Sequence, residues 1–291
     1  MRSAFKILLL GTGITAMAGI TTQAWAPKDK GSRAPDPAYI APAAPQAGEI
    51  AMDLNLSGYV LGIKLVSARY KATLGNGHYD VYSDMKTSGL AAILKKQKLW
   101  SYSEGRYDKT DMKPDLHIQQ NLNKKSRRIE VNYDYDEEII DQSVNPRFGS
   151  MGQPPATMEQ AFASDDANTA MLKVLMAGHR LESEVCNENI PVYDGKQHYG
   201  LRMERQGYKT QKFNGEKYQA IECHVYFDPI SGFDPEDLPD ADEKAKPVKV
   251  YLINKPEYGI YMPVKFTYKV SGFSAVVKVK NATFVQGKSI E

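Results

Sequence analysis

Cys186 and Cys223 are the only cysteines in the chain. An even number of cysteines favours a disulfide when a protein is exported to an oxidising compartment. Two buried free thiols are the alternative that the residues leave open. A catalytic thiol fits less well, because neither cysteine has neighbours that would lower its pKa. We therefore expect a Cys186–Cys223 bond closing a loop of about 37 residues.

Metal and nucleophile chemistry has no matching pattern in this sequence. No histidine is spaced from another His, Cys, Asp or Glu as in HExxH or CxxC metal sites. The chain has no GxSxG motif, no SxxK with its partner KTG, and no phosphate-binding loop. These absences predict a protein that is not an enzyme and has no cofactor. The histidines, interpreted as structural or surface residues, are His78, His117, His179, His198 and His224.

Charged residues gather in three places. Two acidic clusters could offer oxygen ligands to calcium, but neither has EF-hand spacing, so solvated loops are the favoured interpretation. Residues 86–128 include eleven basic and only four acidic residues. The basic residues could form a surface for lipid headgroups or acidic glycans. Lysines that protect exposed sheet edges are the competing interpretation. The acidic clusters are Asp134, Asp136, Glu137, Glu138 and Asp141, and Asp234, Glu236, Asp237, Asp240, Asp242 and Glu243.

Residues 1–26 have the form of a secretory signal peptide. Arg2 and Lys6 precede an apolar run over residues 7–20, and Ala24-Trp25-Ala26 supplies the small residues that a signal peptidase recognises. The run is shorter than the roughly 20 residues of a membrane-spanning helix. With no cysteine near the cut for lipid attachment, we expect a soluble periplasmic protein that begins at Pro27.

Composition limits the partners of the mature protein. Without Arg2 and Lys6, the basic residues fall from 37 to 35, which equals the number of acidic residues. A neutral chain is a poor match for nucleic acid, whose binding needs a dense basic surface. Residues 27–48 hold five prolines and no apolar periodicity, so they are predicted to be a disordered linker.

From Glu49 onward the sequence is typical of β-strands. Ile129, Val131, Tyr133 and Tyr135 alternate with polar residues, as in a strand with one buried face. Tight turns are predicted at Gly75-Asn76-Gly77, at Asp194-Gly195 and at Ser271-Gly272. About ten strands fit the pattern, over residues 54–74, 79–85, 99–107, 116–122, 129–135, 197–205, 219–227, 248–253, 260–270 and 273–279.

The segment 157–178 instead has helical spacing. Thr157 and Gln160 form a capping box, Ser164 or Asp165 could cap a second helix, and Gly178 suits a C-terminal stop. The predicted fold is mainly β: a curved antiparallel sheet or incomplete barrel, with one or two helices over its concave face. Residues 49–291 would form a single β-rich domain.

Three stretches resemble a known family. They are 186–195 (CNENIPVYDG), 221–232 (IECHVYFDPISG) and 261–264 (YMPV), and Asp165-Asp166 before a helix fits the same scheme. This order is similar to the exported proteobacterial proteins of the domain-of-unknown-function family thirty-one-oh-eight (DUF3108). The resemblance implies a periplasmic location and carries over no catalytic residue. More distantly, the order of strands and helices looks like the lipoprotein-carrier fold, in which a curved sheet holds acyl chains under helices.

The sequence therefore predicts a non-enzymatic cell-envelope protein that binds a hydrophobic ligand, a lipid or lipoprotein on a curved β-scaffold. A structural or regulatory module that binds an envelope protein or peptidoglycan is the alternative. A ligand pocket of a few hundred Å³ would lie under the helices. Ordinary packing of the same surfaces is the competing outcome. The candidate lining residues are Phe162, Met171, Val174 and Leu175 on the helices, and Tyr133 and Phe266 on the strands.

Overall fold

The computed structural model describes residues 45–89, 92, 97–108, 111–122, 126–179, 181–270 and 273–287. The predicted signal peptide with Ala24 and Ala26, and nearly all of the predicted linker 27–48, lie outside the described residues. Within the basic stretch 86–128, the same is true of Lys95, Lys96, Lys109, Lys124 and Lys125.

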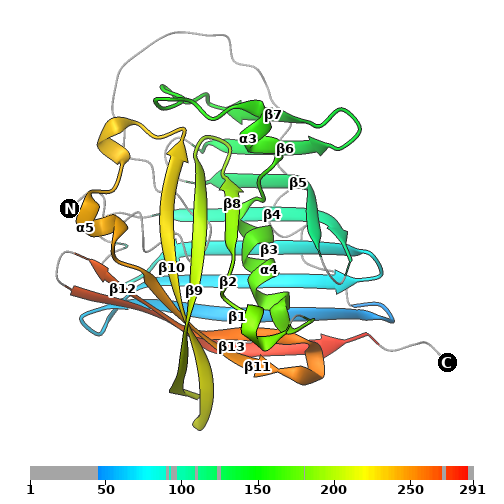
Figure 1. The fold of residues 1–291 in the computed structure, drawn as a ribbon, viewed down its shortest axis with the longest axis vertical. Coiled ribbons are helices and arrows are strands. Elements are labelled where there is room, and N and C mark those ends of the chain that lie inside the picture. The colour runs from blue at the N-terminus through cyan, green and yellow to red at the C-terminus, as the bar shows by residue number, and fades with distance from the viewer. Residues whose placement is uncertain are drawn as a thin grey trace.

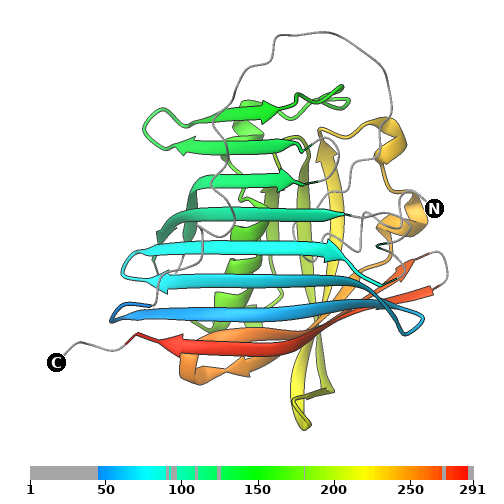
Figure 2. The ribbon, with the colours of Figure 1, turned by 180° about the vertical axis from the view of Figure 1, so that it is seen from behind.

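One antiparallel sheet contains all the named strands, in the order β7-β6-β5-β4-β3-β2-β1-β13-β12-β11-β10-β9-β8. Strand β1 lies in the middle of this sheet, and from it the chain runs outward to β7 at one edge. It then crosses to β8 at the other edge and returns to β13, which pairs with β1 (Figures 1 and 2). The strands are β1 (Glu49–Val60), β2 (Ile63–Gly75), β3 (His78–Thr87), β4 (Lys98–Tyr107), β5 (Met112–Asn121), β6 (Arg128–Asp134), β7 (Ile139–Asn145), β8 (Asn189–Tyr193), β9 (His198–Phe213), β10 (Glu216–Ser231), β11 (Val248–Lys255), β12 (Ile260–Val270) and β13 (Phe273–Gln286).

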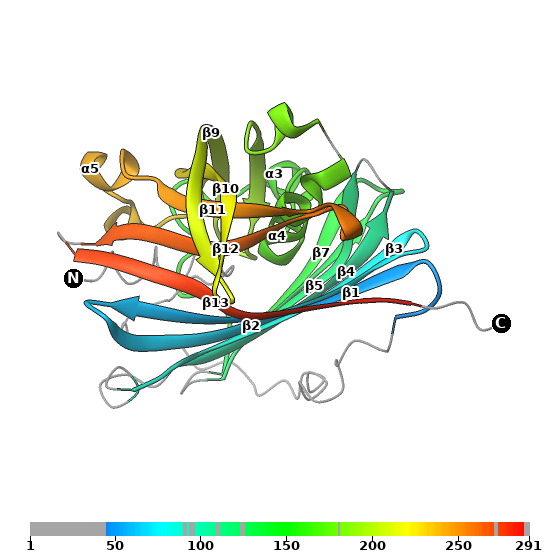
Figure 3. The same cartoon turned by 90° about the horizontal axis from the view of Figure 1, so that it is seen from below.

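The sheet is strongly curved, and the helices of the crossing segment lie on its concave side (Figure 3). Helix α4 packs against β3, β4, β5, β8 and β12, so it contacts both halves of the sheet. The short helix α3 contacts the two edge strands, β7 and β8. The helical elements are α3 (Met158–Phe162), α4 (Ala167–Leu175) and α5 (Ala241–Lys244), with 3-10 turns η3 (Met176–His179), η4 (Glu182–Glu184), η5 (Pro235–Asp237) and η6 (Pro256–Tyr258).

A few side-chain and backbone contacts join the two edges of the unclosed sheet. Just before α4, the Asp165 N–H donates to the Pro191 carbonyl at 3.0 Å, and the Tyr193 N–H donates to the Asp165 carbonyl at 2.9 Å. The Tyr193 hydroxyl then donates to Gln142 Oε1 of β7 at 2.6 Å. The crossing segment therefore ties edge strand β8 to edge strand β7.

The prediction of a mainly β fold with a curved sheet is confirmed, but the count of about ten strands is wrong, because the described residues form a sheet of thirteen. The range 54–74 contains two strands, since Leu61 and Gly62 adopt positive φ angles and make a tight turn. The sequence has no Asn-Gly pair there that would predict this turn. Strand β7 buries few side chains and so lacks a clear alternation. Strand β8 has only five residues, and Pro191 is one of them.

The helix boundaries were predicted in part. The capping box of Thr157 and Gln160 is confirmed at the start of α3. The cap of α4 is Asp166, and neither Ser164 nor Asp165 has that role. Helix α4 ends at Leu175, before Gly178. Gly178 lies in η3, where a Cβ atom would overlap the backbone of Gly259, so close approach of two chain segments explains this glycine.

The apolar core has two main parts. The larger part lies between α4 and both halves of the sheet and includes Leu54, Tyr79, Leu172, Leu252 and Met262, all at most 1 % exposed. The smaller part joins β6 and β7 to α3 and contains Ile129, Val131, Tyr133, Ile140, Ala161 and Tyr193. The concave side of the sheet is thus filled by side chains, and α4 contributes many of them.

Candidate functional site

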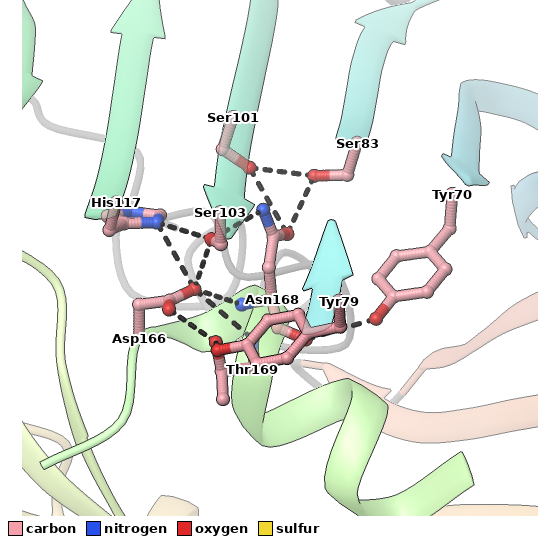
Figure 4. Close-up of polar contacts among 9 residues, drawn as sticks. All are labelled: Tyr70, Tyr79, Ser83, Ser101, Ser103, His117, Asp166, Asn168 and Thr169. Carbon is pink, nitrogen blue, oxygen red and sulfur yellow. Dashed lines mark hydrogen bonds and ion pairs between the residues drawn. The ribbon is translucent and has the colours of Figure 1, made fainter. Parts of the chain in front are cut away.

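The start of α4 meets the concave face of β2–β5 through buried polar side chains rather than apolar ones. We call this group the α4 clamp (Figure 4). None of its members is more than 7 % exposed. The α4 clamp consists of Tyr70, Tyr79, Ser83, Ser101, Ser103, His117, Asp166, Asn168 and Thr169.

Strand pairing positions the sheet residues of the α4 clamp. Tyr70 pairs with Ser83, and Ser83 pairs with Ser101, which places these side chains side by side on β2, β3 and β4. Between β4 and β5, Ser103 pairs with His117. Because residues two apart on a strand share a face, Ser101 and Ser103 both point toward α4.

Asp166 is the centre of the α4 clamp. As the N-cap of α4, its Oδ1 accepts the backbone N–H groups of Asn168 at 2.8 Å and Thr169 at 3.2 Å. The same oxygen accepts the Ser103 hydroxyl at 2.6 Å and lies 3.1 Å from His117 Nδ1. Its other oxygen accepts the Thr169 hydroxyl at 2.5 Å. One fully buried carboxylate therefore joins the helix to β4 and β5.

Asn168 connects the helix to β2, β3 and β4. Its side-chain oxygen accepts the hydroxyls of Ser83 at 3.0 Å and Ser101 at 3.2 Å, and its Nδ2 donates to Ser103 at 3.2 Å. The Tyr70 hydroxyl donates to the Asn168 carbonyl at 3.0 Å. Every polar atom of the Asn168 side chain thus has a partner, as a buried amide requires.

Burial and hydrogen bonding act in opposite directions on the Asp166 carboxyl. Burial alone would raise its pKa, but the attraction of His117 and hydrogen bonds from His117, Ser103 and Thr169 outweigh it and leave the pKa below its usual value. Burial, with a smaller effect of Asp166, raises the pKa of Tyr70 well above its usual value. The α4 clamp therefore combines a stable carboxylate with neutral tyrosine donors.

The pKa of Asp165 shifts in the opposite direction to that of Asp166. Burial raises its pKa to about 6, although the Lys173 ammonium, 2.9 Å from Oδ1, acts in the other direction. Lys173 also lies 3.4 Å from Asp111. The two adjacent aspartates thus differ: Asp166 stays ionised, whereas Asp165 gains a proton under mildly acidic conditions.

Ser103, His117 and Asp166 invite comparison with a catalytic triad, but their geometry differs. In a triad one imidazole nitrogen contacts the carboxylate and the other takes the serine proton. Here His117 Nδ1 contacts both Asp166 and Ser103 Oγ, the latter at 2.9 Å. The Ser103 hydroxyl donates to Asp166, and all three residues are at most 2 % exposed. This arrangement holds the helix in place and does not activate the hydroxyl as a nucleophile.

Cys186 and Cys223 form the expected disulfide, with their Cα atoms 5.7 Å apart. Cys223 lies on β10, and Cys186 precedes β8, two strands away across β9. The bond ties the end of the crossing segment to the sheet.

The candidate lining residues do not surround one pocket. Leu175 and Phe266 belong to the larger part of the core, with Met171 and Val174 packed against it. Tyr133 and Phe162 belong to the smaller part. The cavity between α4 and β1–β3 has a volume of about 20 Å³, and Met171 is the only one of the six that lines it. Its other lining residues include Leu54, Leu56, Ala68, Tyr70, Ser83, Ala167 and Asn168.

The acidic clusters have local roles in the described residues. Asp134 accepts backbone N–H groups of the turn that follows β6, and Asp240 forms a capping box with Glu243 at the start of α5. Some residues of the first cluster border an open depression of about 400 Å³ beside Arg106. No group of three or more His, Cys, Asp or Glu side chains is arranged to hold a metal ion in the described part of the chain.

The comparison with family models gives one match. Residues 53–273 match the model described as protein of unknown function (DUF3108). The chain belongs to this family. A comparison of this DUF3108 protein with curated proteins finds no match. Among solved structures it is similar to the β-barrel-like protein of domain of unknown function DUF1849 from Brucella abortus. The two are 9 % identical, over 84 % of this chain and 100 % of that chain, with a TM-score of 0.47.

None of the helices in the described ranges of the DUF3108 protein has the length and apolar character of a membrane span.

Sequence patterns did not predict the α4 clamp of the DUF3108 protein. Its members come from four strands and one helix, so no local motif joins them. Two signals were present in the sequence. On β4, Ser101 and Ser103 occupy alternate positions, as residues of a polar stripe on one face do. Asp165-Asp166 is an acidic pair before a helix, which is a capping signal.

Proposed function

We propose that this DUF3108 protein is a non-enzymatic protein of the bacterial cell envelope, located in the periplasm. Its curved β-scaffold would bind an envelope partner through its outer surface. The predicted signal peptide and the Cys186–Cys223 bond support the location, because disulfides persist in oxidising compartments.

The observation that carries this proposal is the position of α4. The helix occupies the concave face that a lipoprotein carrier leaves for acyl chains, and the α4 clamp fixes it there. The cavity beneath it, about 20 Å³, has room for roughly one water molecule. A drug-sized or lipid ligand needs several hundred Å³. A partner of this scaffold therefore binds outside it.

Binding of a hydrophobic ligand, lipid or lipoprotein inside the sheet is the second candidate function. One observation favours it: Leu54, Leu56 and Met171, which are apolar and, in the case of Met171, adaptable, line part of the small cavity, beside the charged residues Arg69 and Asp84. Displacement of α4 would enlarge this space. The ligand would then have to supply the free energy that separates the α4 clamp.

The absence of catalysis is part of the proposal and is supported by the α4 clamp. Ser103, His117 and Asp166 contact one another, and their burial keeps substrate away from them. A catalytic group must reach the substrate within hydrogen-bond distance.

The test is purification of the protein from its own envelope fraction. Release by osmotic shock, a mature N-terminus at Pro27, and a native mass equal to that of the bare polypeptide are expected. Retention of residues 1–26 would contradict the location. If an amphiphile stays bound during native mass spectrometry, ligand binding inside the sheet becomes the favoured function in place of partner binding at the outer surface.

A further inference from the structure

The two edge strands of the sheet differ in what lies against them. On β8, the Pro191 carbonyl and the Tyr193 N–H are bonded to the backbone of Asp165, so the crossing segment occupies the open side of that strand. Strand β7, the outermost strand of the other half in Figure 2, pairs with β6 along its whole length without a bulge. No described strand pairs with its other side.

One contact identifies the unpaired backbone groups of β7. The Ile140 N–H points away from β6, because it donates to Met158 Sδ at 3.4 Å. This direction alternates along an antiparallel ladder, so the N–H groups of Gln142 and Val144 also point away from β6. Neither of them has a hydrogen-bond partner in the ranges that the structure describes.

The β8–β9 turn approaches β7 from the concave face and leaves this edge open. The Gln142 side chain donates to the Gly195 carbonyl there. A Cβ atom on Gly195 would touch Ile129 of β6, so the turn lies over β6, inside the edge. On the outer face, Ile139 is 44 % exposed and Asp141 is exposed as well. A regular, uncovered edge strand is a surface on which an extended chain can add a strand.

The open edge carries negative charge that is not neutralised within the described structure. Residues 134–146, which include β7 and the turn before it, contain five acidic and no basic residues. Glu137, Glu138 and Asp141 are exposed, and their carboxylates have no ion pair or hydrogen bond in the described part of the chain. A partner strand with basic side chains would therefore be attracted to this edge.

The open depression of about 400 Å³ described above adjoins the same edge. Asn132 pairs with Asp141 across β6 and β7, and both border the depression together with Asp134 and Asp136. A long side chain beside Asp141 could thus extend over β6 and meet further carboxylates.

The basic groups at the depression leave its balance negative. Arg106 borders it, but its guanidinium is 3.0 Å from Asp115 and lies 4.3 Å from the centre of the Tyr135 ring. The Lys113 ammonium is 5.6 Å from the centre of the same ring. The carboxylates that border the depression outnumber Lys113, which is the unpaired basic group beside Tyr135.

We propose that β7 is the docking site for an extended, lysine- or arginine-rich segment of another envelope protein, which adds to the sheet as a further strand. Main-chain hydrogen bonds to Gln142 and Val144 would hold this segment. Its basic side chains on the outer face would lie beside Asp141 and reach the depression. This inference rests on the proposed function, since it names the chemistry of the envelope partner.

Binding of a labelled peptide tests the docking site. The protein is purified from its own envelope fraction. The probe is a fluorescent peptide of seven residues, the length of β7, in which lysine alternates with threonine. Fluorescence anisotropy at low salt should show saturable binding. The same peptide with glutamate in place of lysine should not bind, and added salt should weaken binding of the lysine peptide, because salt screens exposed charges.

A second peptide separates strand pairing from charge attraction. It keeps every lysine but carries N-methyl groups on the alternate amide nitrogens that would donate to β7. Because it cannot form these main-chain hydrogen bonds, its dissociation constant should be about tenfold higher or more.

Substitutions locate the binding on the protein. Glu137→Gln should raise the dissociation constant of the lysine peptide about threefold, and Glu137→Gln with Asp141→Asn about tenfold. The matched control is Glu236→Gln in η5, an exposed glutamate whose carboxylate also has no partner among the described residues. It should change the dissociation constant less than about twofold.

The proposal is overturned if the lysine peptide does not bind, or if the glutamate peptide or the N-methylated peptide binds as tightly. Equal effects of Glu137→Gln and Glu236→Gln would also overturn it, and a dimer of the protein that excludes the peptide would assign β7 to a second copy instead. None of these outcomes affects the proposed function, because export, mature N-terminus and retained mass are measured separately.

Discussion

Replacement of Asp166 by alanine is the sharpest perturbation of the α4 clamp. The substitution leaves a small side chain that fits the site, so its effect comes from lost contacts. It removes the acceptor of two backbone N–H groups of α4 and of the Ser103 and Thr169 hydroxyls. It also leaves His117 without its carboxylate.

The structure sets the size of the expected effect. Loss of an N-cap costs about 1 kcal/mol. Each buried donor left without an acceptor costs about 1–3 kcal/mol. Since these effects overlap, we expect Asp166→Ala to lower the free energy of unfolding by about 4 kcal/mol. Asp166→Asn keeps one acceptor oxygen and should lose about half as much.

Urea unfolding at neutral pH, followed by fluorescence and circular dichroism, measures this loss. Asp240→Ala is the matched control, because Asp240 is also an N-cap in a capping box but lies on the exposed helix α5. It should cost no more than about 1 kcal/mol. If Asp166→Ala is as mild as Asp240→Ala, the α4 clamp does not fix the helix and the reasoning fails.

Three further predictions follow from individual contacts. Because burial raises the pKa of Asp165 to about 6, above its unfolded value near 4, the folded state binds the extra proton. Unfolding free energy should therefore rise by up to about 3 kcal/mol from pH 7 to pH 4 through this group. In unfolding measured across that range, the stability of wild type relative to Asp165→Asn should increase by that amount as the pH falls. Replacing Cys186 and Cys223 by serine should cost about 4 kcal/mol, measured by urea unfolding, and thiol labelling of the unreduced wild-type protein should find no free thiol. Gly178→Ala should lower the melting temperature by several degrees, because its Cβ would overlap the Gly259 backbone, whereas Gly149→Ala, with open space around it, should leave the melting temperature unchanged.

Period-two alternation predicted most of the strands, because half-buried strands must alternate. This pattern failed to predict strands that bury few side chains and turns that lack the usual turn residues. Strand β7 buries little, and the turn at Leu61-Gly62 lacks the residues that usually mark a hairpin. The family resemblance, carried by the stretches around Cys186 and Cys223, is confirmed over residues 53–273.

The α4 clamp could not be predicted from sequence. It depends on strand register, which brings together residues tens of positions apart. Ser83 meets Ser101 and Asn168 only through the pairing of β3 with β4 and the docking of α4.

Native-state hydrogen exchange of α4 tests the central claim, that the helix is a fixed filling of the concave face. The backbone amides of Ala170 and Leu172 are buried with their helix against the sheet. If the α4 clamp fixes the helix, these amides should exchange only through global unfolding, with the same free energy as the core amides of β3 and β4. Exchange through a low-energy opening of α4, while β3 and β4 stay protected, would contradict the claim and identify α4 as a movable cover over an internal site.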